Sequence, residues 1–259
     1  MIHDILAAGS GTLVGFVLGL IGGGGSILAV PLLIYGVGVQ STHVAIGTSA
    51  VAVALSALSS LVVHARAGNV HWPCALVFAA CGIVGASLGS TIGKSFDGQR
   101  LLFLFGLLMI AIALLTLRKP KGEIKEFVPL TKESVAAVAP RLAAFGGGAG
   151  LFAGFFGIGG GFLVVPGLVA GARMPLLAAI GSSLVSVFAF GLATATNYAL
   201  SGLIDWRLVV MFVLGGIAGS LFGGRLAARL ARQKRTLSIV FAVIVAGVGV
   251  YVVVRGLVG

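Results

Sequence analysis

Long apolar runs separated by short polar breaks dominate this chain. Six runs reach or approach the roughly 20 residues that a membrane-spanning helix needs: residues 42–63, 72–92, 101–117, 176–200, 208–230 and 236–254. The pattern predicts an all-α polytopic membrane protein. Composition agrees, since 59% of the residues are hydrophobic, 9% are charged and the mean hydropathy is +1.18.

Two further apolar regions, residues 5–39 and 142–172, are each interrupted by a glycine cluster and a proline. At 1.5 Å per residue, residues 5–21 reach about 25 Å and residues 27–37 about 16 Å, against a hydrocarbon core of about 30 Å. Each region either crosses the bilayer once or enters and returns as a broken, re-entrant hairpin. No basic n-region precedes the first run, so we interpret it as a retained helix.

The two halves of the chain correspond position by position. Residues 19–31 align with residues 154–166 at an offset of 135, with matching glycines and a matching proline. Further on the offset is 134, and it relates Gly47, Gly68 and Trp72 to Gly181, Gly202 and Trp206. We therefore expect a first membrane repeat over residues 1–117, a basic linker over 118–141 and a second membrane repeat over 142–259.

Charge counting separates the two topologies. With four crossings per half, the 17 Lys and Arg residues divide nine against eight between the two faces. With a hairpin and three crossings per half, they divide thirteen against four. Cytoplasmic loops carry the excess of basic residues, so the hairpin version is favoured. It predicts inverted repeats, periplasmic termini and a cytoplasmic linker, and it explains the net charge of +11 without nucleic acid.

The glycine clusters offer backbone groups at membrane depth, where unwound backbone persists only if it is buried in protein or lines a cavity. Where a helix resumes, near Ser26 and near Phe162, its free N–H groups and positive dipole end can hold an anion. Nearby hydroxyls can join them. The candidate substrate-binding residues are Gly22, Gly23, Gly24, Gly25, Ser26, Thr48, Ser49, Gly157, Gly159, Gly160, Gly161, Ser182 and Ser183.

Structural alternatives accompany these assignments. The glycines permit close helix packing, and Ser or Thr side chains cap helices or bond to their own turn. For the glycines at 82, 85, 89, 216, 219 and 223 we favour packing, because spacings of three and four lie along one helix face. Weaker polar candidates are Ser56, Ser59, Ser60, Thr194, Thr196 and Asn197.

The ionisable residues indicate the sign of the substrate. All six acids, Asp4, Asp97, Glu123, Glu126, Glu133 and Asp205, lie outside the predicted spans. Cation carriers usually need buried carboxylates, so their absence favours an anion or a neutral solute. Cys74 and Cys81 form no CxxC motif, and we expect no metal and no cofactor. His64 either couples transport to protons or is a solvated surface histidine.

The hinge GlyLeuIleGlyGlyGlyGlySer, its partner GlyPhePheGlyIleGlyGlyGly and the following GlyThrSer and GlySerSer resemble the TauE/SafE family of sulfite exporter-type permeases. The resemblance covers nearly the whole chain. It implies a multi-pass bacterial inner-membrane transporter of sulfur-containing or organic anions such as sulfite or sulfoacetate. From the paired hinges we predict a secondary transporter that holds the anion through backbone N–H groups and works by alternating access. Two alternatives stay open: an anion channel of the same architecture, and an intramembrane hydrolase using Ser60 and His64 as nucleophile and base.

Overall fold

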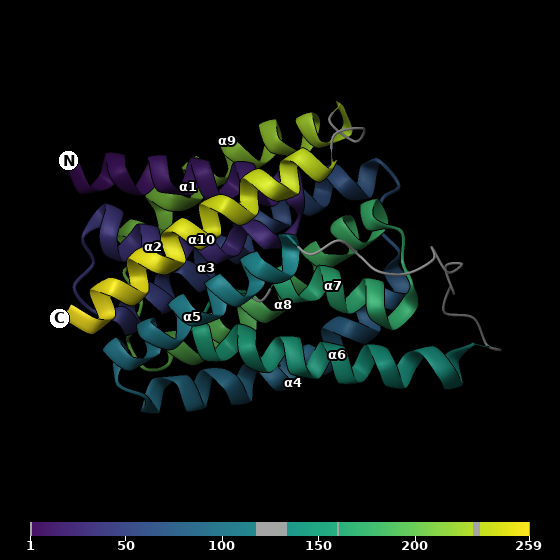
Figure 1. Cartoon of the computed structure of the whole chain (residues 1–259), viewed down its shortest axis with the longest axis horizontal. Coiled ribbons are helices and arrows are strands. Elements are labelled where there is room, and N and C mark those ends of the chain that lie inside the picture. Colours follow the sequence, from purple (N-terminus) through teal and green to yellow (C-terminus); the bar gives the residue numbers. More distant parts are fainter. Residues whose placement is uncertain (1, 118–133, 160, 230–233, 259) are drawn as a thin grey trace.

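A computed structural model describes residues 2–117, 134–159, 161–229 and 234–258. Throughout these ranges the regular structure is helical, and the helices lie side by side in a bundle (Figure 1). In chain order they are α1 (Ile2–Ile21), η1 (Gly23–Leu28), α2 (Ala29–Pro31), η2 (Leu32–Val37), α3 (Thr42–Arg66), α4 (Trp72–Ser95), α5 (Gly98–Leu117), α6 (Val135–Phe156), α7 (Gly161–Ala172), α8 (Leu176–Ala199), α9 (Trp206–Arg229) and α10 (Lys234–Val258).

The six predicted spans correspond to α3, α4, α5, α8, α9 and α10. In the part of the chain that the structure describes, seven helices are long and apolar enough to cross a membrane. Five of these seven are α3, α4, α5, α8 and α9, and the other two, α1 and α6, are the first arms of the glycine-broken regions. Within α10 the apolar part counted among the described residues is the shorter Ala242–Gly256. The polytopic all-α prediction is confirmed, and the first arm of each broken region is longer than the sequence suggested.

Both glycine-broken regions fold as hairpins. In the first, the ring Nδ1 of His3 lies 2.6 Å from the carbonyl oxygen of Val37, so the chain returns to the start of α1. In the second, Gly171 near the end of α7 packs against Leu142 near the start of α6. The return arms are the shorter ones, residues 23–37 and 161–172. The single-crossing alternative does not describe either region.

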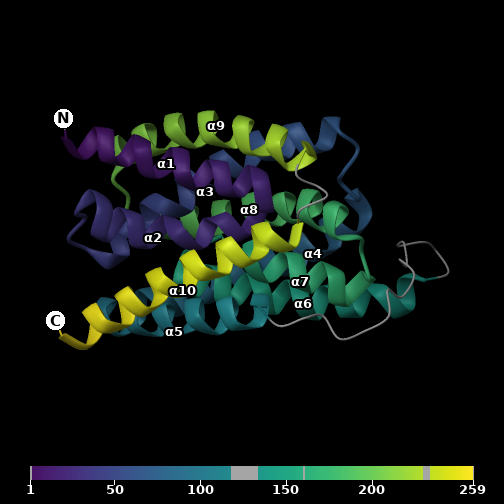
Figure 2. The ribbon, with the colours of Figure 1, turned by 45° about the horizontal axis from the view of Figure 1, so that its top comes forward.

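Helices from opposite halves pair along their lengths. α1 packs along α9, α4 along α6 and α5 along α10, while α3 and α8 meet between these pairs (Figures 1 and 2). α3 and α8 are also the most deeply buried of the seven long helices. The halves are therefore interleaved, and the centre of the bundle is built from both.

α6 begins earlier than the sequence suggested. It starts at Val135 and includes Pro140 and Arg141, which we had assigned to the linker. The polar stretch before Pro140 favoured a boundary there, but α6 continues through Pro140 as an interior proline, at the cost of one backbone hydrogen bond. Residues 118–133 of the expected linker, with Glu123, Glu126 and Glu133, lie outside the described residues.

The two described ends of the chain lie at the same end of the bundle (Figure 1). α1 starts there and α6 starts at the opposite end, so the two hairpins enter the bundle from opposite ends (Figures 1 and 2). We call the end with the chain termini the terminal end, and the end from which α6 starts the linker end.

Candidate functional site

The first glycine hinge is a buried break between α1 and its return arm. Gly22 adopts φ 78°, which L side chains rarely take, and this ends α1. A Cβ at this position would also lie 2.9 Å from Cγ2 of Ile180 in α8. The chain then winds as a 3₁₀ turn from Gly23, and residues 23–28 are all buried. The helix resumes at Gly23, three residues before the predicted restart at Ser26.

The second hinge ends α6 in the same way. Gly157 adopts φ 67°, its N–H donates to the carbonyl of Gly154 and that of Ile158 donates to the carbonyl of Ala153. This is a Schellman arrangement, which satisfies the last carbonyls of a helix. A Cβ on Gly157 would lie 2.0 Å from Cγ2 of Ile46 in α3. Gly160 lies outside the described residues, and α7 begins at Gly161.

The two hinges meet inside the bundle. A Cβ built on Gly23 would lie 2.3 Å from the Cα of Gly161, and one built on Gly161 would lie 2.1 Å from the oxygen of Gly23. Val187 of α8 lies beside both Gly23 and Gly159. The two backbone segments can approach this closely because neither Gly23 nor Gly161 has a side chain. The structure therefore brings together two clusters that are more than 130 residues apart in sequence.

Each hinge is contacted by a serine of the other half. The N–H of Gly23 donates to Oγ of Ser183 over 3.2 Å, and Oγ of Ser49 donates to the carbonyl of Gly157 over 3.3 Å. Both serines also bond to their own helices, through the carbonyls of Ile180 and Ile46. The first hinge therefore presents a backbone donor to its serine, and the second hinge presents a backbone acceptor.

Ser26 hydrogen-bonds within the first hinge. Its hydroxyl donates to the carbonyl of Gly23 over 2.8 Å, and the side chain is fully buried. The second hinge has Gly161 at the corresponding position, with no hydroxyl to offer. The two hinges are therefore chemically unequal.

Thr48 and Ser182 hold loop backbone of the opposite half. Oγ1 of Thr48 accepts from the N–H of Asp205 over 3.0 Å, and Oγ of Ser182 accepts from the N–H of His71 over 2.9 Å. These loops precede α9 and α4. Neither contact is the bond to the residue's own turn that the sequence offered as the alternative, since each hydroxyl holds backbone of the other half. Their predicted contact with a substrate stays a prediction.

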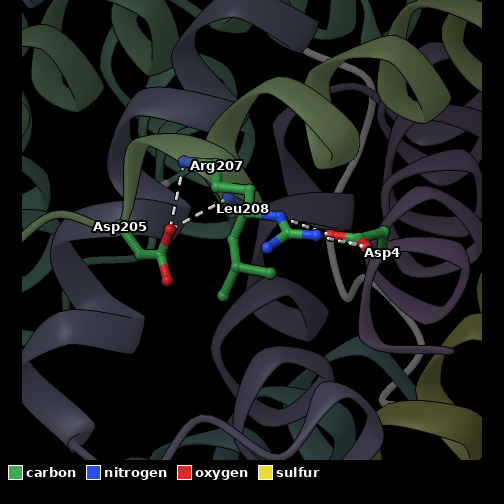
Figure 3. Close-up of polar contacts among 4 residues, drawn as sticks. All are labelled: Asp4, Asp205, Arg207 and Leu208. Atoms are coloured by element: carbon green, nitrogen blue, oxygen red, sulfur yellow. Dashed lines mark hydrogen bonds and ion pairs between the residues drawn. The ribbon is translucent and has the colours of Figure 1, made fainter. Parts of the chain in front are cut away.

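Carboxylates in the described residues gather at the ends of helices. Asp97 accepts from the N–H groups of Gln99 and Arg100, and Asp205 from those of Arg207 and Leu208 (Figure 3). Asp4 lies inside α1, contrary to its placement outside the spans, but only in the first turn. Between the ends of the described helices no carboxylate is present, and no group of three metal-binding side chains occurs there.

An ion pair that the sequence did not reveal lies at the terminal end. The guanidinium of Arg207 donates to both carboxylate oxygens of Asp4, at 3.0 and 2.9 Å (Figure 3). The pair borders a cleft of about 450 Å³ between the starts of α1 and α9 and the loop at residues 38–41. The two partners lie 203 residues apart, and no local pattern links them.

Several polar atoms inside the bundle have no hydrogen-bond partner among the described residues. They include Oγ of Ser56 and Ser60 and Nδ1 of His64 on α3, and the hydroxyls of Ser186, Thr194 and Tyr198 on α8. Ser60 and His64 do not bond to each other, so no nucleophile–base pair is formed. The other weak candidates are engaged: Ser59 with Ser220, Thr196 with its own helix and Asn197 with Ser90 and Lys94.

Comparison with known proteins points to membrane transport. A family model described as Sulfite exporter TauE/SafE matches residues 7–252. A Xylella fastidiosa protein named "Probable membrane transporter protein" is 51% identical over 97% of this chain and 95% of its own length. The Bacillus subtilis protein named "Probable membrane transporter protein YunE" is 30% identical over 89% of each chain. No solved structure matches the chain.

Proposed function

Because the chain belongs to the sulfite exporter TauE/SafE family, we propose that it is a secondary transporter of small anions in the bacterial inner membrane. One observation carries the location of the site. Two glycine hinges on broken helices meet inside the bundle, and each is contacted by a serine from the other half. Broken helices that meet near the membrane midplane are the usual binding elements of secondary transporters.

Backbone N–H groups of the hinges hold the anion in this proposal. α7 runs from Gly161 to Ala172, and the positive end of its dipole faces the first hinge. The N–H of Gly23 donates to Oγ of Ser183 in this structure. When an oxyanion binds, it replaces Ser183 as the acceptor of this N–H. Ser49 shares its one hydroxyl proton between the carbonyls of Ile46 at 2.9 Å and Gly157 at 3.3 Å, and it can turn this hydroxyl to the anion.

Inverted repeats supply alternating access. The contacts made by the two halves support this part of the proposal, because they correspond under the offset of 134 to 135. Ser183 and Ser49 correspond, and they contact the N–H and the C=O of corresponding peptide groups, Gly22–Gly23 and Gly157–Ile158. Ser182 with His71 corresponds to Thr48 with Asp205. Each half thus hydrogen-bonds to the hinge and to one loop of the other half. Rocking of one half against the other then exposes the hinges to either face in turn.

The substrate class follows from charge and from the family description. No carboxylate occurs between the ends of the described helices, so a cation finds no counter-charge there, whereas N–H and O–H donors suit an oxyanion. The family description names sulfite. We therefore propose sulfite or a small organosulfonate as substrate, moved outward from the cytoplasm.

The test is flux through purified protein in liposomes. Sulfite, thiosulfate, sulfate and sulfoacetate are offered separately over a range of concentrations. We expect saturable flux of at least one anion in the wild type. Ser49→Ala removes a hydroxyl that turns to the anion and should reduce flux about tenfold, the effect of losing about one hydrogen bond. Ser183→Ala removes the acceptor that competes with the anion for the N–H of Gly23 and should instead lower the half-saturating anion concentration.

Ser87→Ala is the matched control. Its hydroxyl is exposed and bonds to its own helix at the carbonyl of Ile83, so flux should match the wild type. Wild-type kinetics in both Ser183→Ala and Ser49→Ala would move the site away from the hinges. Absence of flux for all four anions in the wild type would contradict the proposed function itself.

A further inference from the structure

His64 has an unusual position for a histidine near the end of a membrane helix. Its side chain is only 3% exposed, and Nε2 lies 3.2 Å from the carbonyl oxygen of Gly19 in α1. A carbonyl can only accept, so Nε2 carries the proton in this contact. Nδ1 then bears a lone pair, and within the described residues it has no partner. The ring is thus a buried base with one open proton-accepting position.

Two serines extend this position toward the hinges. Ser56, Ser60 and His64 are spaced by four residues, so they lie on one face of α3 about 6 Å apart. All three are buried, and Ser56 Oγ, Ser60 Oγ and His64 Nδ1 have no hydrogen-bond partner in the described structure. Val53, one turn before Ser56, lies beside Gly159 of the second hinge. We call Ser56, Ser60 and His64 the α3 polar column.

No charge in the described structure compensates this column. α1 has no ionisable side chain after Asp4, and the only one on α8 is the phenol of Tyr198. Arg66, at the end of α3, and Arg225, next to Gly224 of α9, are both exposed. Gly224 itself contacts Val63, so α9 approaches the column with glycine and not with a carboxylate. A protonated His64 would stand as an uncompensated cation in an apolar interior.

Such a cation is costly, and so is an anion held there by hydroxyls alone. Together the two charges offset each other. The imidazolium and the hydroxyl of Ser60 are both donors, and one oxyanion can accept from both. The unpaired atoms and the missing carboxylate therefore have one explanation, in which a proton and an anion enter the column together.

We propose that the α3 polar column is a proton-linked oxyanion site, which makes the transporter an anion–proton symporter. The column is a second position on the anion's path, next to the hinges. A proton from water adds to the lone pair of His64 Nδ1, the anion on its way to the hinges binds against that N–H and the Ser60 hydroxyl, and both leave to water on the other face. No covalent bond forms or breaks in the substrate. This inference rests on the proposed anion transport and adds its coupling ion.

The second half bears on the stoichiometry. Thr194 and Tyr198 occupy the positions of Ser60 and His64 at the offset of 134, and their hydroxyls are likewise buried and unpartnered. Neither of them is a base that takes a proton near neutral pH. Only the first half can therefore carry the coupled proton, so one proton accompanies one anion.

The experiment measures protons taken up when anions bind to the purified full-length protein in a weakly buffered solution with a pH indicator. Thiosulfate, sulfate and sulfoacetate are the probes, because they stay fully ionised near neutral pH. The wild type should take up about one proton per anion at pH values where free His64 is neutral. Its affinity should then rise about tenfold for each unit by which the pH is lowered.

Variants separate the two roles. His64→Gln should abolish proton uptake and flatten the pH dependence of binding, whereas Ser60→Ala should weaken binding but keep the proton stoichiometry. His43→Gln is the matched control, since His43 lies on the same helix outside the column, and it should behave as the wild type. Melting curves in detergent identify a variant that fails to fold.

Wild-type protein that binds or transports the anions without proton uptake would overturn the coupling and leave anion transport standing. Proton uptake by His64→Gln equal to that of the wild type would overturn the assignment to His64. If no anion binds to the wild type or crosses the liposomes, the proposed function fails first, and the coupling fails with it.

Discussion

At the scale of single residues, Gly22 and Gly157 decide where the helices break. Both adopt a positive φ, and at both a side chain would meet an isoleucine of the opposite half, Ile180 or Ile46. The sequence predicted a break at each cluster because glycine has a low helix propensity and several glycines are adjacent. It could not show that the facing isoleucines leave no space, because that depends on the packing of α3 and α8.

Replacing Gly157 with alanine separates backbone strain from packing. Gly202 has the same φ of 67° but nothing within 4 Å of a built Cβ, so Gly202→Ala should cost only the strain, roughly 1–2 kcal/mol. Gly157→Ala adds the contact with Ile46 and should cost roughly 1–3 kcal/mol more. Thermal unfolding in detergent measures both. Equal losses would mean that the hinge packs more loosely than the structure shows.

At the scale of elements, glycines spaced by three and four along one helix face, which we call ridge glycines, let helices of the two halves pack closely. Along α1, a Cβ on Gly15 would lie 2.0 Å from the carbonyl of Gly216 in α9, and along α4 a Cβ on Gly85 would lie 2.2 Å from that of Gly147 in α6. The packing interpretation of the ridge glycines is therefore confirmed. The sequence predicted the ridges from spacing alone, but not which helices they would bring together.

A matched pair on α1 tests the ridge. Gly15→Ala forces α1 and α9 apart and should lower the melting temperature, with a loss of roughly 1–3 kcal/mol. Gly9→Ala, on the same helix with nothing within 4 Å, should be neutral or stabilise by up to about 1 kcal/mol because alanine favours helix. A stable Gly15→Ala variant would contradict the close α1–α9 contact.

At the scale of the whole molecule, basic residues separate between the two ends of the bundle. Arg66, Arg173 and Arg225 lie at the linker end of the described structure, where α9 ends and α10 begins, whereas the few at the terminal end include Arg207 and Arg255 (Figure 1). Both hairpins return to the end from which they start. These described residues agree in direction with the charge asymmetry predicted from the sequence. Under the positive-inside rule, a cytoplasmic linker end stays a prediction.

Cysteine labelling tests this orientation. In a variant with Cys74 and Cys81 replaced by alanine, single cysteines are placed at exposed loop positions: Gln40→Cys and Ser201→Cys at the terminal end, and Ala67→Cys at the linker end. An impermeant maleimide added outside spheroplasts should label the first two, and Ala67→Cys only after permeabilisation. The reverse pattern would invert the topology.

The sequence by itself determined the membrane class, the six long spans and the glycine breaks, because hydropathy and helix propensity are properties of short windows of chain. Its charge count also favoured the hairpins over single crossings. Only the tertiary structure decided that the two hinges touch, that Ser49 and Ser183 contact them across the halves and that Thr48 and Ser182 hold loops instead. It likewise left the α3 polar column unpaired. These features depend on contacts between residues more than 100 positions apart, which are set by how α3 and α8 pack at the centre and not by any local pattern.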